Sequence, residues 1–372
     1  MVLRADVNKV ITKSGYVESI STGGNDLVKI GGGGAGSIAT NDGHDKVVTT
    51  TKWVRDIYTG NGRDEVVIGK GNAGRVDTGV ANDKVIAKGW VEMIQTDLGK
   101  DVVLIRDGGA GLIRTGGGND KITTNAGHVL AIRAAEGHDV VKIGVGGAST
   151  VFLGNGNDKA LVSELSDTTQ GVVVHGRSGT DTIDFGNFTV GVTFSLDMAG
   201  QYQNVGDPNG DVSAAPAKGY FAETSVENIL GSGLDDNLQG DSEANLLSGR
   251  KGADTLEGME GADIIFVGND AVVDTLIYNS VDDSTAAERD TVKLFVVGTD
   301  KIDLSGIDGD SNTEANDALV YSASPNVANS VWVEVSGADE IVKGDVTGDG
   351  VADFEILLEN VTGLSASDFI LS

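Results

Sequence analysis

The chain has 372 residues, of which 55 are glycine, 3 are proline and none is cysteine. It carries 56 acidic and 27 basic side chains, which give a formal net charge of -29. The lack of cysteine excludes a disulfide scaffold, a zinc ribbon and thiol catalysis. The negative charge predicts no binding to nucleic acid, and no apolar run approaches the roughly 20 residues that a membrane span needs. A cation is the partner that this composition favours.

An aspartate recurs between residues 26 and 158 at intervals of 19 residues, with one interval of 18. Mostly apolar residues stand two and four positions after each aspartate, as Val28 and Ile30 do after the first. This alternation predicts a strand with one buried face. The aspartates of the series are Asp26, Asp45, Asp64, Asp83, Asp101, Asp120, Asp139 and Asp158.

A second apolar position precedes each aspartate by seven residues from Ile38 onward, and in several repeats a threonine such as Thr40 follows it by two. This pattern predicts a second strand in every repeat. Two short strands and two turns in about 19 residues predict one coil of a parallel β-solenoid, in which equivalent residues stack at roughly 4.8 Å. The turn with the aspartate is rich in glycine, whereas the opposite turn carries almost no carboxylate.

The period changes after an excursion at residues 186–230. Four nine-residue units follow at residues 231–266, and they read GSGLDDNLQ, GDSEANLLS, GRKGADTLE and GMEGADIIF. Their sixth places hold Asp236, Asn245, Asp254 and Asp263. Later segments such as SVWVEV and FEILLEN predict a small β-rich cap. The predicted organisation is an all-β chain with a parallel β-solenoid at 1–185, the excursion at 186–230, a β-roll at 231–270 and a C-terminal cap at 271–372.

The nine-residue units resemble the calcium-binding repeats-in-toxin (RTX) family, whose pattern is GGxGxDxUx. The segments VGTDKIDLSGID, GDVTGDGVADFEI and DFILS look like the C-terminal region of serralysin-type proteins. The resemblance covers about residues 171–372. It implies a parallel β-roll that binds several Ca²⁺ ions, a C-terminal export signal read by the type I secretion machinery, and a secreted bacterial protein that acts outside the cell or at its surface. The beginning of the chain has no apolar stretch of signal-peptide length, so we expect no Sec-dependent export.

The physical argument for calcium is independent of this resemblance. Stacked carboxylates repel one another, and a hard divalent cation that takes about 6 to 8 oxygen ligands relieves the repulsion. Glycines in the turns free backbone carbonyls to act as further ligands. We therefore expect the aspartates of both repeats to bind calcium, with Asn245 a weaker, neutral substitute. The alternative is that each aspartate caps its own turn through a hydrogen bond.

A further candidate calcium loop lies at residues 345–353, which read DVTGDGVAD. Asp345, Asp349 and Asp353 fall at places 1, 5 and 9 of such a loop, with Gly350 at the turn position 6. Place 12 holds Ile356 instead of glutamate. The segment is either an incomplete calcium site or an acidic turn.

No catalytic residue is predicted. The four histidines, His44, His128, His138 and His175, lack the i, i+4 spacing around a glutamate that a zinc protease needs. No Gly-x-Ser-x-Gly elbow and no phosphate-binding loop occurs. We expect that the protein is not an enzyme, with a site in the 186–228 excursion as the alternative.

Two stacked rows suggest surfaces for a ligand. Tyr16, Trp53, Trp90 and His128 recur at every second coil, and an exposed row of rings would suit an extended extracellular polysaccharide. The alternative is that each ring covers the glycine turn of a neighbouring coil. The threonine row suggests ice binding, but a flat ice-binding face needs a second parallel row, which is missing. The alternative is that the threonines point inward and form a ladder along the stack of coils.

The function expected from the sequence is that of a secreted, non-enzymatic calcium-binding protein with a structural or adhesive role at the cell surface or in the extracellular matrix. Its folding is expected to depend on calcium. The alternatives are a glycan-binding or ice-binding module, a bacteriocin-like or toxin-like effector, and an enzyme with a site in the excursion. No insertion into a membrane is expected.

Overall fold

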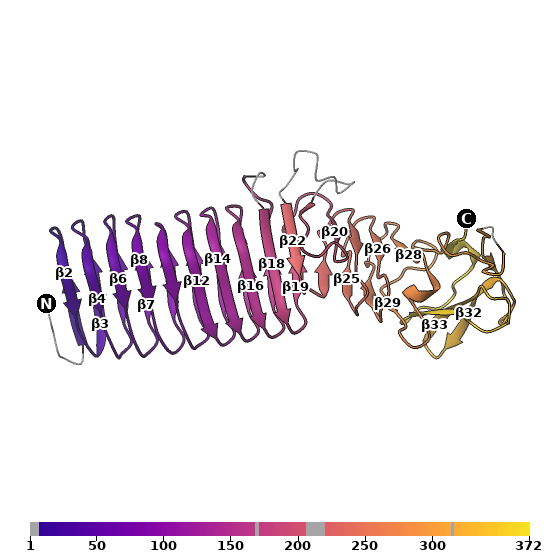
Figure 1. Cartoon of the computed structure of the whole chain (residues 1–372), viewed down its shortest axis with the longest axis horizontal. Helices are drawn as coiled ribbons and strands as arrows, with labels where there is room; N and C mark the ends of the chain where they lie inside the picture. Colours follow the sequence, from indigo (N-terminus) through magenta and orange to yellow (C-terminus); the bar gives the residue numbers. More distant parts are fainter. Residues whose placement is uncertain (1–6, 168–170, 206–219, 314–315) are drawn as a thin grey trace. The chain divides into compact units, whose positions relative to one another are not determined.

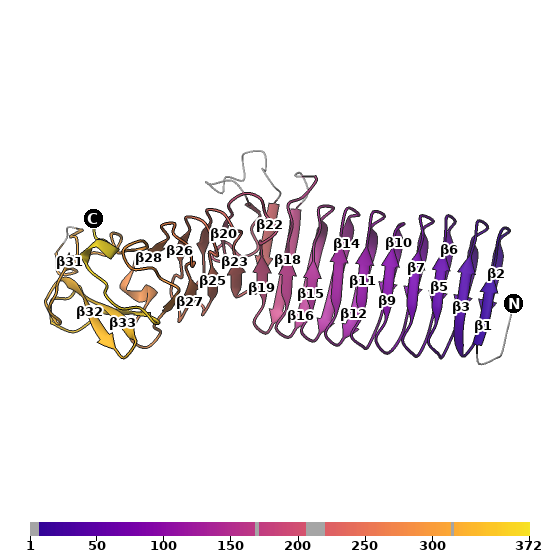
Figure 2. The ribbon, with the colours of Figure 1, turned by 180° about the vertical axis from the view of Figure 1, so that it is seen from behind.

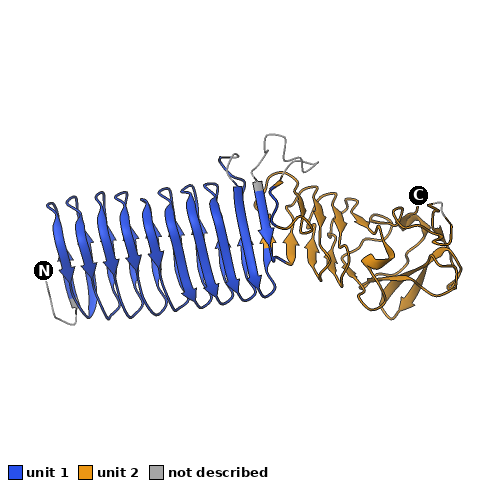
Figure 3. Cartoon of the chain, viewed as in Figure 1, with its two compact units in different colours: residues 1–182, 200–202, 215–226 blue, residues 183–199, 203–214, 227–372 orange. Residues whose placement is uncertain are grey.

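The computed structural model describes residues 7–167, 171–205, 220–313 and 316–372. Over this part of the chain the fold is all-β, apart from two short 3-10 turns, η1 (Val281–Asp283) and η2 (Ala366–Asp368). The predicted fold class is therefore confirmed. Figure 3 shows the two compact units: unit 1 contains residues 1–182, 200–202 and 215–226, and unit 2 contains residues 183–199, 203–214 and 227–372. None of the described elements is a helix long and apolar enough to cross a membrane.

Unit 1 is a parallel β-solenoid in which every coil contributes one strand to each of two sheets (Figures 1 and 2). The strands that follow the aspartates form the first sheet: β1 (Val7–Ile11), β3 (Asn25–Ile30), β5 (Lys46–Thr49), β7 (Glu65–Ile68), β9 (Lys84–Ala87), β11 (Val102–Ile105), β13 (Lys121–Thr124), β15 (Val140–Lys142) and β17 (Lys159–Leu161).

The second sheet pairs the other strand of each coil, also in parallel register. Its strands are β2 (Val17–Ser21), β4 (Ala35–Ala39), β6 (Val54–Tyr58), β8 (Ala73–Asp77), β10 (Val91–Gln95), β12 (Ala110–Gly117), β14 (Val129–Glu136), β16 (Ala148–Asn155), β18 (Gly171–Ser178) and β22 (Tyr220–Thr224).

The core of unit 1 lies between the two sheets. The predicted inward positions are buried: Val47 and Val66 of the first sheet and Ile38 and Ile57 of the second have no exposed surface. Each such side chain stabilises the fold by about 1.5–3 kcal/mol through its removal from water. Because each coil repeats the same apolar positions, the core continues without a break along the stack of coils.

Glycine stands two positions before each column aspartate except Asp83, where Ala81 has a φ of 97°, because neighbouring coils approach closely there. Gly62 has a φ of 128°, and a Cβ on it would lie 1.7 Å from the carbonyl oxygen of Gly43 in the preceding coil. No side chain fits at such a distance. The glycine-rich turn is thus a consequence of coil stacking, and it brings backbone carbonyls of adjacent coils next to the aspartates.

Unit 2 contains a second pair of parallel sheets. One consists of β23 (Asn228–Leu230), β25 (Leu246–Ser248), β27 (Ile264–Phe266), β29 (Thr291–Lys293) and β34 (Phe354–Leu358). The other consists of β20 (Thr193–Ser195), β24 (Asn237–Gln239), β26 (Thr255–Glu257), β28 (Thr275–Ile277), β30 (Lys301–Asp303) and β35 (Phe369–Ile370). Paired residues such as Leu246 and Ile264 are 18 positions apart, so each nine-residue unit forms half a coil.

The C-terminal cap continues the roll. Strands β32 (Ser330–Ser336), β33 (Asp339–Asp345) and β34 form an antiparallel meander, and β34 adds in parallel to β29. The last strand, β35, pairs with β30. The remaining short strands are β19 (Thr182–Asp184), β21 (Gln203–Asn204) and β31 (Val320–Tyr321). Roll and cap therefore lie in one compact unit, and the predicted excursion at 186–230 is divided between the two units, with residues 206–219 outside the described residues.

Candidate calcium-binding columns

The aspartates of unit 1 form one buried column, with side chains that are 1–4% exposed from Asp26 to Asp158. Each Oδ1 atom accepts a hydrogen bond from the backbone N–H of the equivalent residue in the preceding coil. The N–H of Asp45 donates to Asp64 and that of Asp64 donates to Asp83, both at 2.8 Å. The aspartates therefore connect successive coils, which a cap within a single turn would not do.

The second carboxylate oxygen of this column has a different environment. From Asp26 to Asp158, every Oδ2 atom is buried and has no hydrogen-bond partner. The inward threonine row lies beside the column, and burial raises the pKa of Asp64 to about 6 against the lowering effect of the Thr59 hydroxyl. That hydroxyl, however, donates along the stack to the carbonyl oxygen of Thr78 at 3.2 Å, so the Oδ2 atoms stay unpartnered. Orphan buried oxygens of this kind are costly unless a cation lies against them.

Burial dominates the electrostatics of the column. Burial, together with the neighbouring carboxylates Asp64 and Asp101, raises the pKa of Asp83 to about 7 against the lowering effect of the Asp64 N–H. Burial likewise raises the pKa of Asp139 to about 7 and that of Asp101 to about 6. Within the described part of the chain, no salt bridge to lysine or arginine is formed by an aspartate of this column. Protons or cations are needed to compensate the charge.

Unit 2 carries two shorter columns, one at each turn of the roll. The first joins Asp236, Asp254, Asp274 and Asp300 through N–H to Oδ1 hydrogen bonds. The second joins Asn245, Asp263 and Asp290 in the same way. Burial raises the pKa of Asp254 and of Asp263 to about 8 and that of Asp290 to about 7, and their Oδ2 atoms have no hydrogen-bond partner.

Two members of these columns differ from the rest. Both oxygens of Asp236 are occupied: Oδ1 accepts from the Val192 N–H and the Ser232 hydroxyl, and Oδ2 accepts from the Ser232 N–H. Asn245 accepts the N–H of Asp241. These two positions close their local turns, as the alternative interpretation of the repeat supposed, whereas Asp254 and Asp263 keep a free oxygen.

Several column members could not be found by counting residues. Asp181 accepts the N–H of Asp158 at 2.8 Å, although 23 residues separate them. Asp274, Asp290 and Asp300 follow their column neighbours by 20, 27 and 26 residues. Insertions displace these aspartates from the regular interval. The signal that remains is the apolar residue two places later, such as Leu276 after Asp274.

The donor set of the columns fits a hard cation. The available atoms are carboxylate oxygens without hydrogen bonds and backbone carbonyls of tight glycine turns, and Ca²⁺ prefers such oxygens. In the part of the chain that the structure describes, no three His, Cys, Asp or Glu side chains cluster as a metal site would require. A calcium ion at these columns would therefore take most of its ligands from backbone carbonyls, with one or two aspartates completing the shell.

The loop of residues 345–353 uses its carboxylates internally. Asp345 is fully buried and accepts the N–H groups of Gly348 and Gly350, both at 2.7 Å. Asp353 accepts the N–H groups of Val346 and Thr347. Asp349 accepts the N–H of Val351. The loop is thus closed by its own hydrogen bonds, and its calcium binding stays a prediction.

The threonine row and the aromatic row that were predicted as ligand surfaces are largely covered by neighbouring residues. The threonines Thr40, Thr59, Thr78, Thr96 and Thr115 are fully buried, so this row is no surface for ice. Tyr16 and Trp53 are 65% and 42% exposed, but Trp90 and His128 are half-buried. A uniformly exposed aromatic strip was therefore a wrong prediction. A Cβ on Gly109 would lie 3.2 Å from the Trp90 ring, which shows that the ring covers the glycine turn of the next coil.

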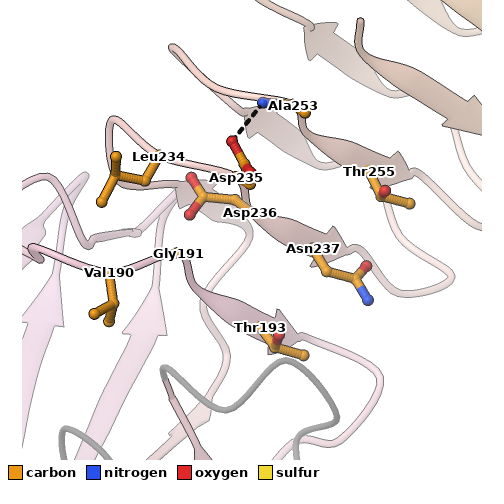
Figure 4. A pocket seen from close by; sticks show the side chains of 9 residues that line it. All are labelled: Val190, Gly191, Thr193, Leu234, Asp235, Asp236, Asn237, Ala253 and Thr255. Carbon is orange, nitrogen blue, oxygen red and sulfur yellow. Dashed lines mark hydrogen bonds between the residues drawn. The ribbon is translucent and has the colours of Figure 1, made fainter.

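A pocket of unit 2 lies beside β20, β24 and β26 and has a volume of about 670 Å³ (Figure 4). Asp235 and Asp236 are its titratable residues. Asp235 accepts the Ala253 N–H at 2.8 Å, the dashed line in Figure 4, and Asp236 is held by Ser232 and Val192. Both carboxylates stabilise turns, and the lining contains no nucleophile paired with a base.

The fold and the columns define a parallel β-roll protein of the RTX type. The chain belongs to the family described as Peptidase M10 serralysin C terminal, whose model matches residues 150–371. It is 42% identical to serralysin of Photorhabdus luminescens over 130 residues, which are 35% of this chain and 25% of that protein. It is 35% identical to the metallopeptidase AprA of Pseudomonas marginalis over 193 residues, 52% of this chain and 37% of that one. The chain thus matches well under half of the length of either relative.

Solved structures with a similar trace include a hyperactive, Ca²⁺-dependent, β-helical antifreeze protein from an Antarctic bacterium, with 23% identity, a TM-score of 0.41 and coverage of 71% of this chain and 76% of that one. The AlgE6R2 subunit of a mannuronan C5-epimerase from Azotobacter vinelandii has 25% identity and a TM-score of 0.28, with coverage of 37% and 86%.

Proposed function

We propose that this chain is a secreted, calcium-dependent β-roll protein with a non-enzymatic, structural or adhesive role outside the bacterial cell. The observation that carries the proposal is the column from Asp26 to Asp158, in which every coil buries a carboxylate with one unpartnered oxygen and no cationic side chain beside it. Membership of the serralysin C-terminal family supports the same conclusion for the second half of the chain.

When it is bound, calcium supplies the positive charge, and the chain supplies the oxygen ligands. The backbone N–H groups of each coil hold the Oδ1 atoms of the next coil, and the Oδ2 atoms are left without a hydrogen-bond partner. Backbone carbonyls of the glycine-rich turns would supply the remaining oxygen ligands. Millimolar extracellular calcium would therefore stabilise the stack, whereas the low calcium concentration of the cytosol would not.

A structural or adhesive role predicts retention of the intact protein at cell surfaces. Fluorescently labelled protein is added to cells of the source bacterium with 5 mM calcium and then washed with calcium or with a chelator. Retention in calcium and release by the chelator are expected. A protein that stays in the supernatant in both buffers, while folded, would contradict the adhesive role.

Export through a type I secretion machinery is the second part of the proposal, and it rests on the family match together with the C-terminal sequence SDFILS. Deletion of residues 368–372 is expected to leave the protein inside cells that carry a matching transporter. Because β35 also belongs to the folded roll, the control is Phe295→Ala, which removes another buried ring of unit 2 but keeps the tail. The control should be exported. Normal secretion of the truncated chain would refute the assignment.

A further inference from the structure

An aromatic ring and two arginines lie together on the outer face of the second sheet of unit 1. Phe152 of β16 pairs in register with Arg133 of β14 and with His175 of β18. Its ring stacks on His175, with centroids 4.7 Å apart. The guanidinium carbons of Arg133 and Arg177 lie 5.4 Å and 5.0 Å from the ring centroid. Phe152 thus holds two cationic side chains in place through cation–π contacts.

These two arginines are unusual in a chain with a net charge of -29. Two other arginines of the same sheet pair with carboxylates: Arg55 with Asp56 at 2.8 Å and Arg75 with Asp77 at 2.7 Å. Among the described residues, neither Arg133 nor Arg177 forms a salt bridge. Both side chains are exposed. Two guanidinium groups are therefore available to an external anion.

The arginines line a pocket of about 190 Å³ with Phe152 between them. Its wall also contains Glu136 and Asn155, and the Asn155 amide donates to the Glu136 carboxylate at 2.8 Å. The pocket thus combines guanidinium donors with carboxylate and amide acceptors. An isolated sulfate or phosphate would meet the Glu136 charge, whereas a ligand that carries both an acid group and hydroxyl groups can use both kinds of partner.

Arg177 occupies a backbone position that the three preceding coils give to glycine or alanine. Its φ is 89°, and the register of the sheet aligns it with Gly154, Ala135 and Gly116, which also have positive φ. A long side chain in this region costs about 1 kcal/mol relative to glycine. No salt bridge among the described residues compensates that cost, so the strain points to a use of the side chain outside the fold.

We propose that this pocket binds a uronate unit of an acidic polysaccharide, with Arg133 and Arg177 holding its carboxylate and with Glu136 and Asn155 accepting its hydroxyl groups. Planar guanidinium groups match a carboxylate through paired hydrogen bonds. Phe152 acts as a positioning residue, since the two arginines and His175 already cover its ring. This inference rests on the proposed function, because the pocket exists only in the folded, calcium-loaded solenoid.

The test is isothermal titration of the calcium-loaded full chain with trigalacturonate, with its neutral methyl ester and with inorganic sulfate. Trigalacturonate should bind, and both comparison ligands should bind at least tenfold more weakly. Arg177→Gly restores the residue that the turn prefers, so it should retain thermal stability while it loses at least tenfold in affinity. Arg133→Gln should lose as much, and Arg55→Gln, on the same sheet, should bind like the wild type.

Three outcomes would overturn the proposal. The first is no binding of trigalacturonate by wild-type protein that circular dichroism shows to be folded in calcium. The second is an unchanged affinity of Arg177→Gly, and the third is sulfate binding as tight as that of trigalacturonate, which would indicate a simple anion site. The first of these leaves the proposed function intact. A wild-type chain that does not fold in calcium would instead refute the proposed function itself.

Discussion

Each column aspartate has two oxygens with separate roles. In Asp83, Oδ1 accepts the Asp64 N–H at 2.8 Å and links two coils, whereas Oδ2 is buried without a hydrogen-bond partner. The first oxygen stabilises the fold by hydrogen bonding, while the second carries charge that burial disfavours. Substitutions can separate these roles, because asparagine keeps the acceptor and removes the charge.

Asp83→Asn is expected to stabilise the calcium-free protein, because it removes a buried carboxylate whose pKa burial raises to about 7 and keeps the coil-to-coil hydrogen bond. In calcium the same substitution should weaken binding, because a ligand charge is lost. Asp83→Ala should be about 1–3 kcal/mol less stable than Asp83→Asn in both conditions, since it also leaves the Asp64 N–H unpaired. Denaturant unfolding in saturating calcium, and the folded fraction seen by circular dichroism in calcium-free buffer, compare all three proteins. Equal stability of Asp83→Asn and wild type in both conditions would show that the column bears neither charge strain nor calcium.

At the scale of the elements, the sequence predicts a column where the interval is constant. Asp26 to Asp158 could be located because each coil has the same length, and Val28 or Ile38 mark the strands around them. Asp290 could not, because 27 residues separate it from Asp263, and the hydrogen bond from the Asp263 N–H that joins the two coils cannot be read from the spacing. The exposure of Trp90 could not be predicted either, since it depends on how closely the next glycine turn approaches.

The column predicts how the stability of the calcium-free protein depends on pH. Burial raises the folded-state pKa of Asp83 and Asp139 to about 7 and that of Asp254 to about 8, whereas unfolded aspartate has a pKa of about 3.9. Between about pH 4 and pH 8 the folded state binds more protons than the unfolded state, so its stability falls as the pH rises. In calcium-free buffer the melting temperature should be highest near pH 5 and should fall as the pH rises, until the chain is largely unfolded at pH 8. A melting temperature that rises over this range would contradict the account, and saturating calcium should flatten the profile.

The last strand, β35, predicts a stability effect of the C terminus. Phe369 is 8% exposed, and Asp368 accepts the N–H of Gly298 at 2.6 Å and that of Ser365 at 2.8 Å. Phe369→Ala should therefore destabilise unit 2 by about 3 kcal/mol in calcium. Ile370→Ser, at a half-buried position in the same strand, should cost less. An unfolding midpoint of Phe369→Ala equal to that of the wild type would show that β35 does not contribute to the folded roll.

For the whole molecule, composition and charge indicate the class of ligand that we propose, a cation. The surplus of acid comes partly from columns in which carboxylates repeat without cationic partners, and we expect an external cation to compensate them. Composition was not sufficient to locate the uncompensated arginines: Arg177 stands in an ordinary polar turn of the sequence, and its strain becomes visible in the backbone. The division of the 186–230 segment between two units likewise follows from tertiary pairing that no local pattern contains.

The central claim, that folding is coupled to calcium, is tested most directly by far-ultraviolet circular dichroism of the full chain during a calcium titration after removal of divalent cations. We expect a largely unfolded spectrum below micromolar calcium and a cooperative transition to a β-spectrum as calcium approaches the millimolar range. Magnesium should cause no such transition, because Mg²⁺ gives up its water ligands reluctantly. A native β-spectrum that persists unchanged in excess chelator would contradict the central claim.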